Sequence, residues 1–85
     1  MKTIPCKKFE KKVAKLPKSI QEVLIYKLGI FIEDPFSAVL NNHSLHGSKK
    51  SYRSINITGD YRVIYELYDV DTARLIDIDT HSNLY

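Results

Sequence analysis

Three histidines are the residues best suited to proton transfer in this chain. His43 and His46 flank Leu45 in a polar segment, and His81 follows the last apolar run. An imidazole exchanges protons near neutral pH, so these side chains are candidates for general acid–base catalysis. Two other interpretations stay open: exposed loop histidines, and a metal site built from all three. The metal interpretation lacks the support of an H-E-x-x-H pattern or a cysteine pair.

Basic and aromatic side chains lie close to the histidines in the sequence. A guanidinium can bind a phosphate through two parallel hydrogen bonds, and an ammonium adds a point charge. Tyrosines can stack on unpaired bases, although Tyr65 and Tyr68 are better explained as half-buried strand residues. The pattern indicates an RNA-binding surface. Its candidates in this region are Lys49, Lys50, Arg53, Arg62, Tyr52, Tyr61 and Tyr85.

The beginning of the chain is strongly basic, although the whole protein has a formal net charge of only +3. Residues 1–27 contain eight lysines and two glutamates, a net charge of +6, whereas residues 28–85 contain five basic and eight acidic groups, a net charge of −3. Such asymmetry favours a polyanionic partner, and a merely solvated helix face is the alternative. Lys8, Lys11 and Lys12 are the candidate RNA contacts in this region.

The spacing of apolar residues in the first half predicts a strand and two helices. Residues 2–6 read as a short strand. Phe9, Val13 and Leu16 form one apolar stripe, which predicts a helix over residues 7–16 that Pro17 ends. A second helix is predicted over residues 18–33 and ends at Asp34-Pro35. Its expected buried side consists of Ile20, Val23, Leu24, Leu28, Phe31 and Ile32.

The second half changes to the alternation of strands. Strands are predicted over residues 51–57, 61–68 and 74–79, with turns at 58–60 and 69–72, as in an antiparallel meander. Alternation in the last strand places Ile76 and Ile78 on one face, opposite Leu75, Asp77 and Asp79. The expected fold is α+β, in the order β-α-α-β-β-β. A helical hairpin covers one face of a small, mainly antiparallel sheet, and the other face is open.

Length and composition bound the class of protein. The chain has 85 residues, which predicts a single domain over residues 1–85. Its one cysteine, Cys6, excludes an internal disulfide framework, and no apolar run is long enough to span a membrane. We therefore expect a cytoplasmic protein without membrane association. No P-loop, GxGxxG or G-x-S-x-G motif supports an ATPase, a dehydrogenase or a serine hydrolase.

The segment from His43 to Tyr85 resembles the RelE/YafQ-like toxins of bacterial and archaeal toxin–antitoxin pairs. The matching segments are residues 43–47, 52–65 and 76–85. The first half matches more loosely, through Phe9, Leu16-Pro17 and residues 31–35. The resemblance covers essentially the whole chain. It implies a RelE-like fold, with two N-terminal helices behind a small sheet, and a cognate antitoxin as partner.

The resemblance also implies an activity and assigns residues to it. Such toxins cut mRNA on the ribosome without metal or other cofactor, by attack of the RNA 2′-OH on the neighbouring phosphate. His43, Asp60, His81 and Tyr85 match catalytic positions of these toxins, and Arg62 matches an arginine that serves the phosphate. On this basis His81 is the expected general acid, and Asp60 or His43 the base. The lysine-rich helix would then contact ribosomal RNA while the sheet reaches the mRNA.

One position departs from the pattern of these toxins. Asn56 stands where similar toxins carry a further histidine, and an asparagine forms hydrogen bonds but exchanges no proton at neutral pH. We therefore expect Asn56 to bind RNA. Two alternatives to a nuclease remain: a non-enzymatic toxin of the same fold that poisons gyrase, and a catalytically weakened module that binds an antitoxin. The histidines with Asp60 and Arg62 argue against the first, and Asn56 keeps the second open.

Overall fold

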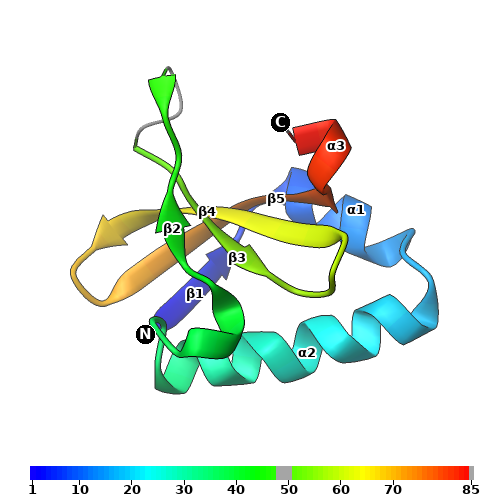
Figure 1. The fold of residues 1–85 in the computed structure, drawn as a ribbon, viewed down its shortest axis with the longest axis horizontal. Coiled ribbons are helices and arrows are strands. Elements are labelled where there is room, and N and C mark those ends of the chain that lie inside the picture. Colours follow the sequence, from blue (N-terminus) through cyan, green and yellow to red (C-terminus); the bar gives the residue numbers. More distant parts are fainter. Residues whose placement is uncertain (48–50, 85) are drawn as a thin grey trace.

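A mixed sheet with helices on both faces organises residues 1–47 and 51–84, which the computed structural model describes (Figure 1). Its helices and strands follow the order predicted from the sequence, with two short additions, β2 and α3. In chain order the elements are β1 (Lys2–Pro5), α1 (Lys7–Ala14), α2 (Lys18–Glu33), the 3₁₀ helix η1 (Ala38–Leu40), β2 (His43–Ser44), β3 (Arg53–Asn56), β4 (Tyr61–Asp69), β5 (Thr72–Thr80) and α3 (His81–Leu84).

The strand order in the sheet is β1-β5-β4-β3-β2. Strand β1 runs parallel to β5, with Lys2 opposite Thr72 and Pro5 opposite Leu75. The other neighbouring strands are antiparallel. The predicted α+β fold with a mainly antiparallel sheet is therefore confirmed.

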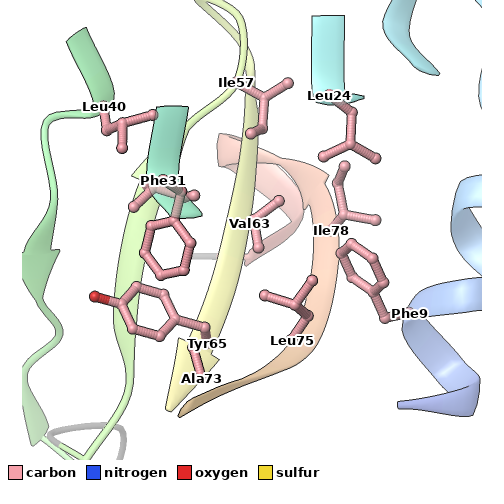
Figure 2. Close-up of a cluster of buried hydrophobic side chains, with 11 residues drawn as sticks. Phe9, Leu24, Phe31, Leu40, Ile57, Val63, Tyr65, Ala73, Leu75 and Ile78 are labelled. Atoms are coloured by element: carbon pink, nitrogen blue, oxygen red, sulfur yellow. The ribbon is translucent and has the colours of Figure 1, made fainter. Parts of the chain in front are cut away.

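The main hydrophobic core lies between the sheet and the two N-terminal helices (Figure 2). Phe31 of α2 is fully buried and packs edge-on against the ring of Tyr65, at 4.9 Å between ring centroids. Phe9 of α1 and Leu24 of α2 extend toward Ile78 on β5 (Figure 2). The Tyr65 hydroxyl accepts a hydrogen bond from Asn42 Nδ2 at 2.7 Å, so the polar end of this buried ring is satisfied.

The boundaries predicted for α2 agree with the structure, but one residue that was expected to be buried is exposed. Ile32 is 43% exposed, and Ile30 packs against the core instead. Successive residues are about 100° apart around a helix, so the residue after the central Phe31 turns away from the sheet. Helix α1 ends at Ala14, two residues earlier than expected.

A β-bulge in β5 overturns the predicted division of its side chains. Tyr65 pairs with Leu75 and Ile64 pairs with Asp77, so Ile76 is an extra residue with no partner opposite it. A bulge of this kind shifts the alternation by one residue. Leu75 and Ile78 therefore both lie in the main core, while Ile76 lies on the other face, close to Ile64.

The face of the sheet away from α2 is not fully open, contrary to the expectation from the sequence. Leu45, Ile64 and Leu84 form a second buried cluster there, with Tyr52 and Ile76 packed against it. Leu84 belongs to α3, which lies on the opposite side of the sheet from α2 (Figure 1). This single helical turn after β5 covers part of the face and brings His81 to it.

Within the described part of the chain, no helix combines the length and the apolar character needed to cross a bilayer.

Candidate active site

The register of the sheet gathers several predicted site residues on the face that carries α3. Asn56, Arg62 and Asp79 stand opposite one another on β3, β4 and β5. A neighbouring row contains His43, Ser54, Ile64 and Asp77. Directly paired residues of a sheet project to the same side, and so do residues two apart on a strand. The two rows therefore form one surface, which we call the α3 face.

Arg62 is held against the turn that joins β3 to β4. Its Nη1 donates to the carbonyl oxygens of Thr58 and Gly59, both at 3.1 Å, and to that of Tyr61 at 3.3 Å. The Thr58 hydroxyl in turn accepts from the amides of Asp60 and Tyr61, which fixes the turn from inside. Within residues 1–47 and 51–84, Nε and Nη2 of Arg62 make no hydrogen bond. These two groups are available to an anion.

The turn and helix α3 are joined by a backbone hydrogen bond. The amide of His81 donates to the carbonyl of Asp60 at 2.8 Å. Both residues are exposed, and Leu84 secures the helix by packing into the second cluster. The structure thus places the backbone of His81 beside the turn that carries Asp60 and that Arg62 of β4 grips.

His43 lies at the edge of the α3 face, on β2, with its ring orientation fixed. Its Nδ1 is 2.8 Å from the carbonyl oxygen of Asn41. A carbonyl oxygen only accepts, so Nδ1 carries the hydrogen, and Nε2 of the neutral ring is an acceptor. Asn41 adopts a left-handed conformation, with φ of 45°, which asparagine tolerates better than most residues. One strand, β3, separates the strand of His43 from that of Arg62.

Asn56 contains a buried acceptor that the fold leaves unsatisfied. Its Oδ1 is inaccessible to solvent and has no hydrogen-bond partner among the described residues. A buried unpaired oxygen of this kind typically costs about 1–3 kcal/mol. Asn56 stands opposite Arg62, so this unpaired oxygen lies beneath the surface beside the arginine.

Two lysines of α1 bind two aspartates of β5 across the end of the α3 face. Lys12 Nζ lies 2.8 Å from Asp77 Oδ1 and 2.9 Å from Asp79 Oδ2, and Lys8 Nζ lies 3.2 Å from Asp77 Oδ2. We call these four residues the lysine–carboxylate cluster. Asp79 Oδ1 also accepts from Asn83 Nδ2 at 3.0 Å, which ties α3 to β5.

The cluster changes the proton affinity of its members. Hydrogen bonds to Asp77 and then to Asp79 raise the pKa of the Lys12 ammonium, against the opposing effect of burial. The Lys12 hydrogen bond, followed by those from Asn83 and the Thr80 amide, lowers the pKa of Asp79 to about 2. Asp79 is therefore ionised across the physiological range, and the cluster holds α1, β5 and α3 together.

Sequence reasoning did not identify this cluster. Lys12 and Asp79 are 67 residues apart, and no local pattern connects them. Asp77 and Asp79 were expected merely to share a strand face. The only signal in the sequence was the excess of lysine on one helix, which the structure partly explains, since Lys8 and Lys12 have carboxylate partners within the fold.

Other predicted RNA contacts lie away from the α3 face. Arg53 pairs with Tyr65 on the side of the main core, where its Nε donates to Asn42 Oδ1 at 2.8 Å and its guanidinium lies over the Phe36 ring. Tyr61 packs against the main core. Lys11 and His46 are exposed. Lys49, Lys50 and Tyr85 lie outside the described residues.

The interpretation of the three histidines as a metal site finds no matching ligand group among the described residues. In the part of the chain that the structure describes, no three His, Cys, Asp or Glu side chains are grouped so as to hold a metal ion. The α3 face instead offers a guanidinium, imidazoles and a carboxylate, which is a set for binding an anion and moving protons.

Comparison with solved structures defines the class of the fold. YafQ from E. coli strain BL21(DE3) matches with a TM-score of 0.80 and 26% identity, over 98% of this chain and 96% of YafQ. YafQ in the E. coli DinJ–YafQ toxin–antitoxin complex matches with a TM-score of 0.78 and 26% identity, over 98% of this chain and 94% of the other.

A third similar structure is more distant in sequence. It is the RelBE2 toxin–antitoxin complex from Mycobacterium tuberculosis, with a TM-score of 0.75 and 21% identity over 94% of this chain and 96% of the other. No protein-family model and no curated protein matches the chain. The chain therefore has the RelE/YafQ-like fold of type II toxin–antitoxin toxins, as its sequence resemblance predicts.

The lysine–carboxylate cluster predicts acid sensitivity in a defined pH range. The pKa of Asp79 is lower in the folded protein than its ordinary value of 3.8, so its contribution to stability is complete above about pH 4 and is lost as the pH falls toward 2. Because Lys12 is partly exposed, we expect this contribution to be about 1–2 kcal/mol. Asp79→Asn should lower the free energy of unfolding by this amount at pH 7, measured by urea denaturation.

The same variant should flatten the dependence of stability on pH between 4 and 2. Glu10→Gln, which removes an exposed carboxylate of α1, is the matched control and should keep the wild-type slope. Parallel curves for Asp79→Asn and wild type over this interval would show that Asp79 contributes nothing to the acid transition.

Proposed function

We propose that this protein is the toxin of a type II toxin–antitoxin pair and that it cleaves mRNA on the ribosome as a metal-independent endoribonuclease. The observation that carries the proposal is the hydrogen bond between the His81 amide and the Asp60 carbonyl, next to the turn that Arg62 grips. It joins the segments that carry His81, Asp60 and Arg62, which supports a shared site at one end of the α3 face. The similarity to YafQ, which has been solved with the antitoxin DinJ, supports a protein antitoxin as partner.

The proposed reaction is an attack within the RNA strand. The 2′-OH loses its proton to a base, its oxygen bonds to the adjacent phosphorus, and the bond from phosphorus to the 5′-oxygen breaks. The leaving oxygen takes a proton from His81. The products are a 2′,3′-cyclic phosphate and a 5′-hydroxyl, and no water, metal or oxidant is consumed.

Four residues besides His81 have a role in this scheme. Arg62 offers Nε and Nη2 to the phosphate oxygens, where negative charge increases in the transition state. Asp60 and His43 are the two candidate bases. Asp60 lies in the turn that the arginine grips, and His43 presents Nε2 from β2. Asn56, which stands opposite Arg62, is proposed to contact the RNA.

In this proposal the ribosome orients the messenger RNA, which so small a protein site could not do alone. Holding the messenger in a fixed conformation aligns the 2′-oxygen with the phosphorus, and alignment alone lowers the barrier of such reactions greatly. The remaining predicted contacts are assigned accordingly. Lys49 and Lys50 would contact RNA, Tyr85 keeps the catalytic role that the resemblance implies, and exposed lysines of α1 such as Lys11 would contact ribosomal RNA.

Replacing His81 tests the proton-transfer role. His81→Gln should lower the rate of mRNA cleavage on purified ribosomes by about 10²–10⁴-fold, because glutamine cannot supply a proton to the leaving oxygen. His46→Gln is the matched control, since His46 is exposed and has no assigned role. Wild-type cleavage by the His81 variant would refute its assignment as the acid.

Induced expression of the wild-type protein separates the alternatives. Translation arrest with cut messenger supports the nuclease, DNA damage would indicate a gyrase poison, and normal growth would indicate an antitoxin-binding module.

Metal independence is tested on the toxin alone. Protein treated with EDTA and desalted should cleave mRNA at the wild-type rate when added to intact ribosomes, because the scheme uses only side chains. A rate that falls after the treatment and recovers with added zinc or magnesium would contradict it.

The exposed lysines of α1 provide a test of ribosome docking. Lys11→Gln with Lys15→Gln should weaken binding to ribosomes and reduce the slope of log affinity against log salt, since fewer counterions are released. Lys2→Gln with Lys18→Gln removes the same charge elsewhere and should have a smaller effect. Lys8 and Lys12 are unsuitable for this test because they bind Asp77 and Asp79. Equal salt slopes for the two double variants would assign these lysines to solvation.

A further inference from the structure

A pocket on the α3 face has no role in the reaction described above. Its volume is about 230 Å³, and it opens between α1, α3 and the sheet. Apolar side chains from the second cluster make up most of its wall, and the Lys8–Asp77 ion pair stands at its polar end. The lining residues are Lys8, Tyr52, Ile64, Ile76, Asp77 and Leu84.

The pocket lies one step along the sheet from the phosphate-binding arginine. Ile64 is two residues after Arg62 on β4, and Asp77 is two residues before Asp79 on β5. Residues two apart on a strand face the same side and are separated by about 7 Å. A single ribose spans this distance between its phosphate and its base. A phosphate held by Arg62 would therefore place a neighbouring base at the mouth of the pocket.

The chemistry of the lining fits a nucleobase better than an apolar group. The aliphatic side chains and the Tyr52 ring suit the faces of a flat aromatic molecule. At the polar end an ammonium donor and a carboxylate acceptor lie side by side, 3.2 Å apart. Every base presents a donor next to an acceptor on its edge, whereas an acyl chain or aliphatic side chain would leave this ion pair desolvated without compensation.

The ion pair combines a fixed group with an adjustable one. The Asp77 side chain is 14% exposed and is also held by Lys12 at 2.8 Å, so its carboxylate is anchored. The Lys8 side chain is 63% exposed and free to turn toward a bound base. An anchored acceptor discriminates among bases by position, because the edge donors of the four bases lie at different places and only some of them meet a fixed carboxylate.

We infer that this pocket is a nucleobase subsite that sets the sequence preference of cleavage, with Asp77 as its specificity-determining residue. The inference rests on the proposed function, since it concerns the base next to the phosphate that Arg62 would bind. The pocket residues, with Asp77 among them, take no part in the proton-transfer scheme, so their role in base recognition is additional to it.

Base preference at the cleavage sites is the decisive measurement. Asp77→Asn replaces an acceptor by an amide of the same shape, and the ratio of cleavage between preferred and disfavoured bases should change by about fivefold or more. Asp79 also contacts Lys12 but does not line the pocket. Asp79→Asn therefore removes an equal charge and should keep the wild-type base preference. Lys8→Gln, at a largely exposed position, should also change the preference and carries little risk of unfolding.

Unchanged base preference in both Asp77→Asn and Lys8→Gln would overturn the subsite while leaving the nuclease assignment intact. A second measurement does not depend on catalysis. Titration of the wild-type protein with the four nucleoside monophosphates should shift the methyl NMR signals of Ile64, Ile76 and Leu84, and Asp77→Asn should change which nucleotide shifts them most. Absence of any shift with all four would overturn the subsite. A shift in a protein that cuts no mRNA would support the pocket and contradict the proposed function.

Discussion

Ile76 has no partner on the neighbouring strand, and this one extra residue decides which side chains of β5 reach each face of the sheet. Without the bulge, strict alternation would send Asp77 and Asp79 to the side opposite Ile76. With it, Leu75 and Ile78 both enter the main core, and the two carboxylates face α3. The anchoring of Lys12, the link from Asp79 to Asn83 and the polar end of the pocket all depend on that switch.

The lysine–carboxylate cluster also settles an electrostatic conflict on the α3 face. Two aspartates beside Arg62 would repel an approaching phosphate if they stood alone. Lys8 and Lys12 neutralise them within the fold, at distances of 2.8–3.2 Å. Two of the lysine charges of α1 are therefore neutralised within the fold. Only exposed lysines without a carboxylate partner, such as Lys11, could attract a polyanionic partner.

Local patterns in the sequence were sufficient for the regular elements. The helix over 18–33 was predictable because its apolar period is long and prolines flank it, and the three long strands were predictable from alternation between turn residues. The bulge at Ile76 leaves no mark in a single sequence, and α3 is too short to show a helical period. Contacts such as Lys12 with Asp79 join distant segments, so no local signal reveals them. The family resemblance selected His81, Arg62 and Asp60, which the fold places side by side, but it gave no reason to notice Asp77.

The parallel pairing of β1 with β5 has a consequence for synthesis of the chain. The Cys6 thiol donates a hydrogen bond to the carbonyl of Ile76, 70 residues later in the chain. The Lys12 ammonium likewise donates to Asp79, 67 residues later. Contacts of such long range form late, since their segments must both be present before either is stabilised. A growing polypeptide therefore cannot assemble the α3 face until β5 and α3 have been synthesised.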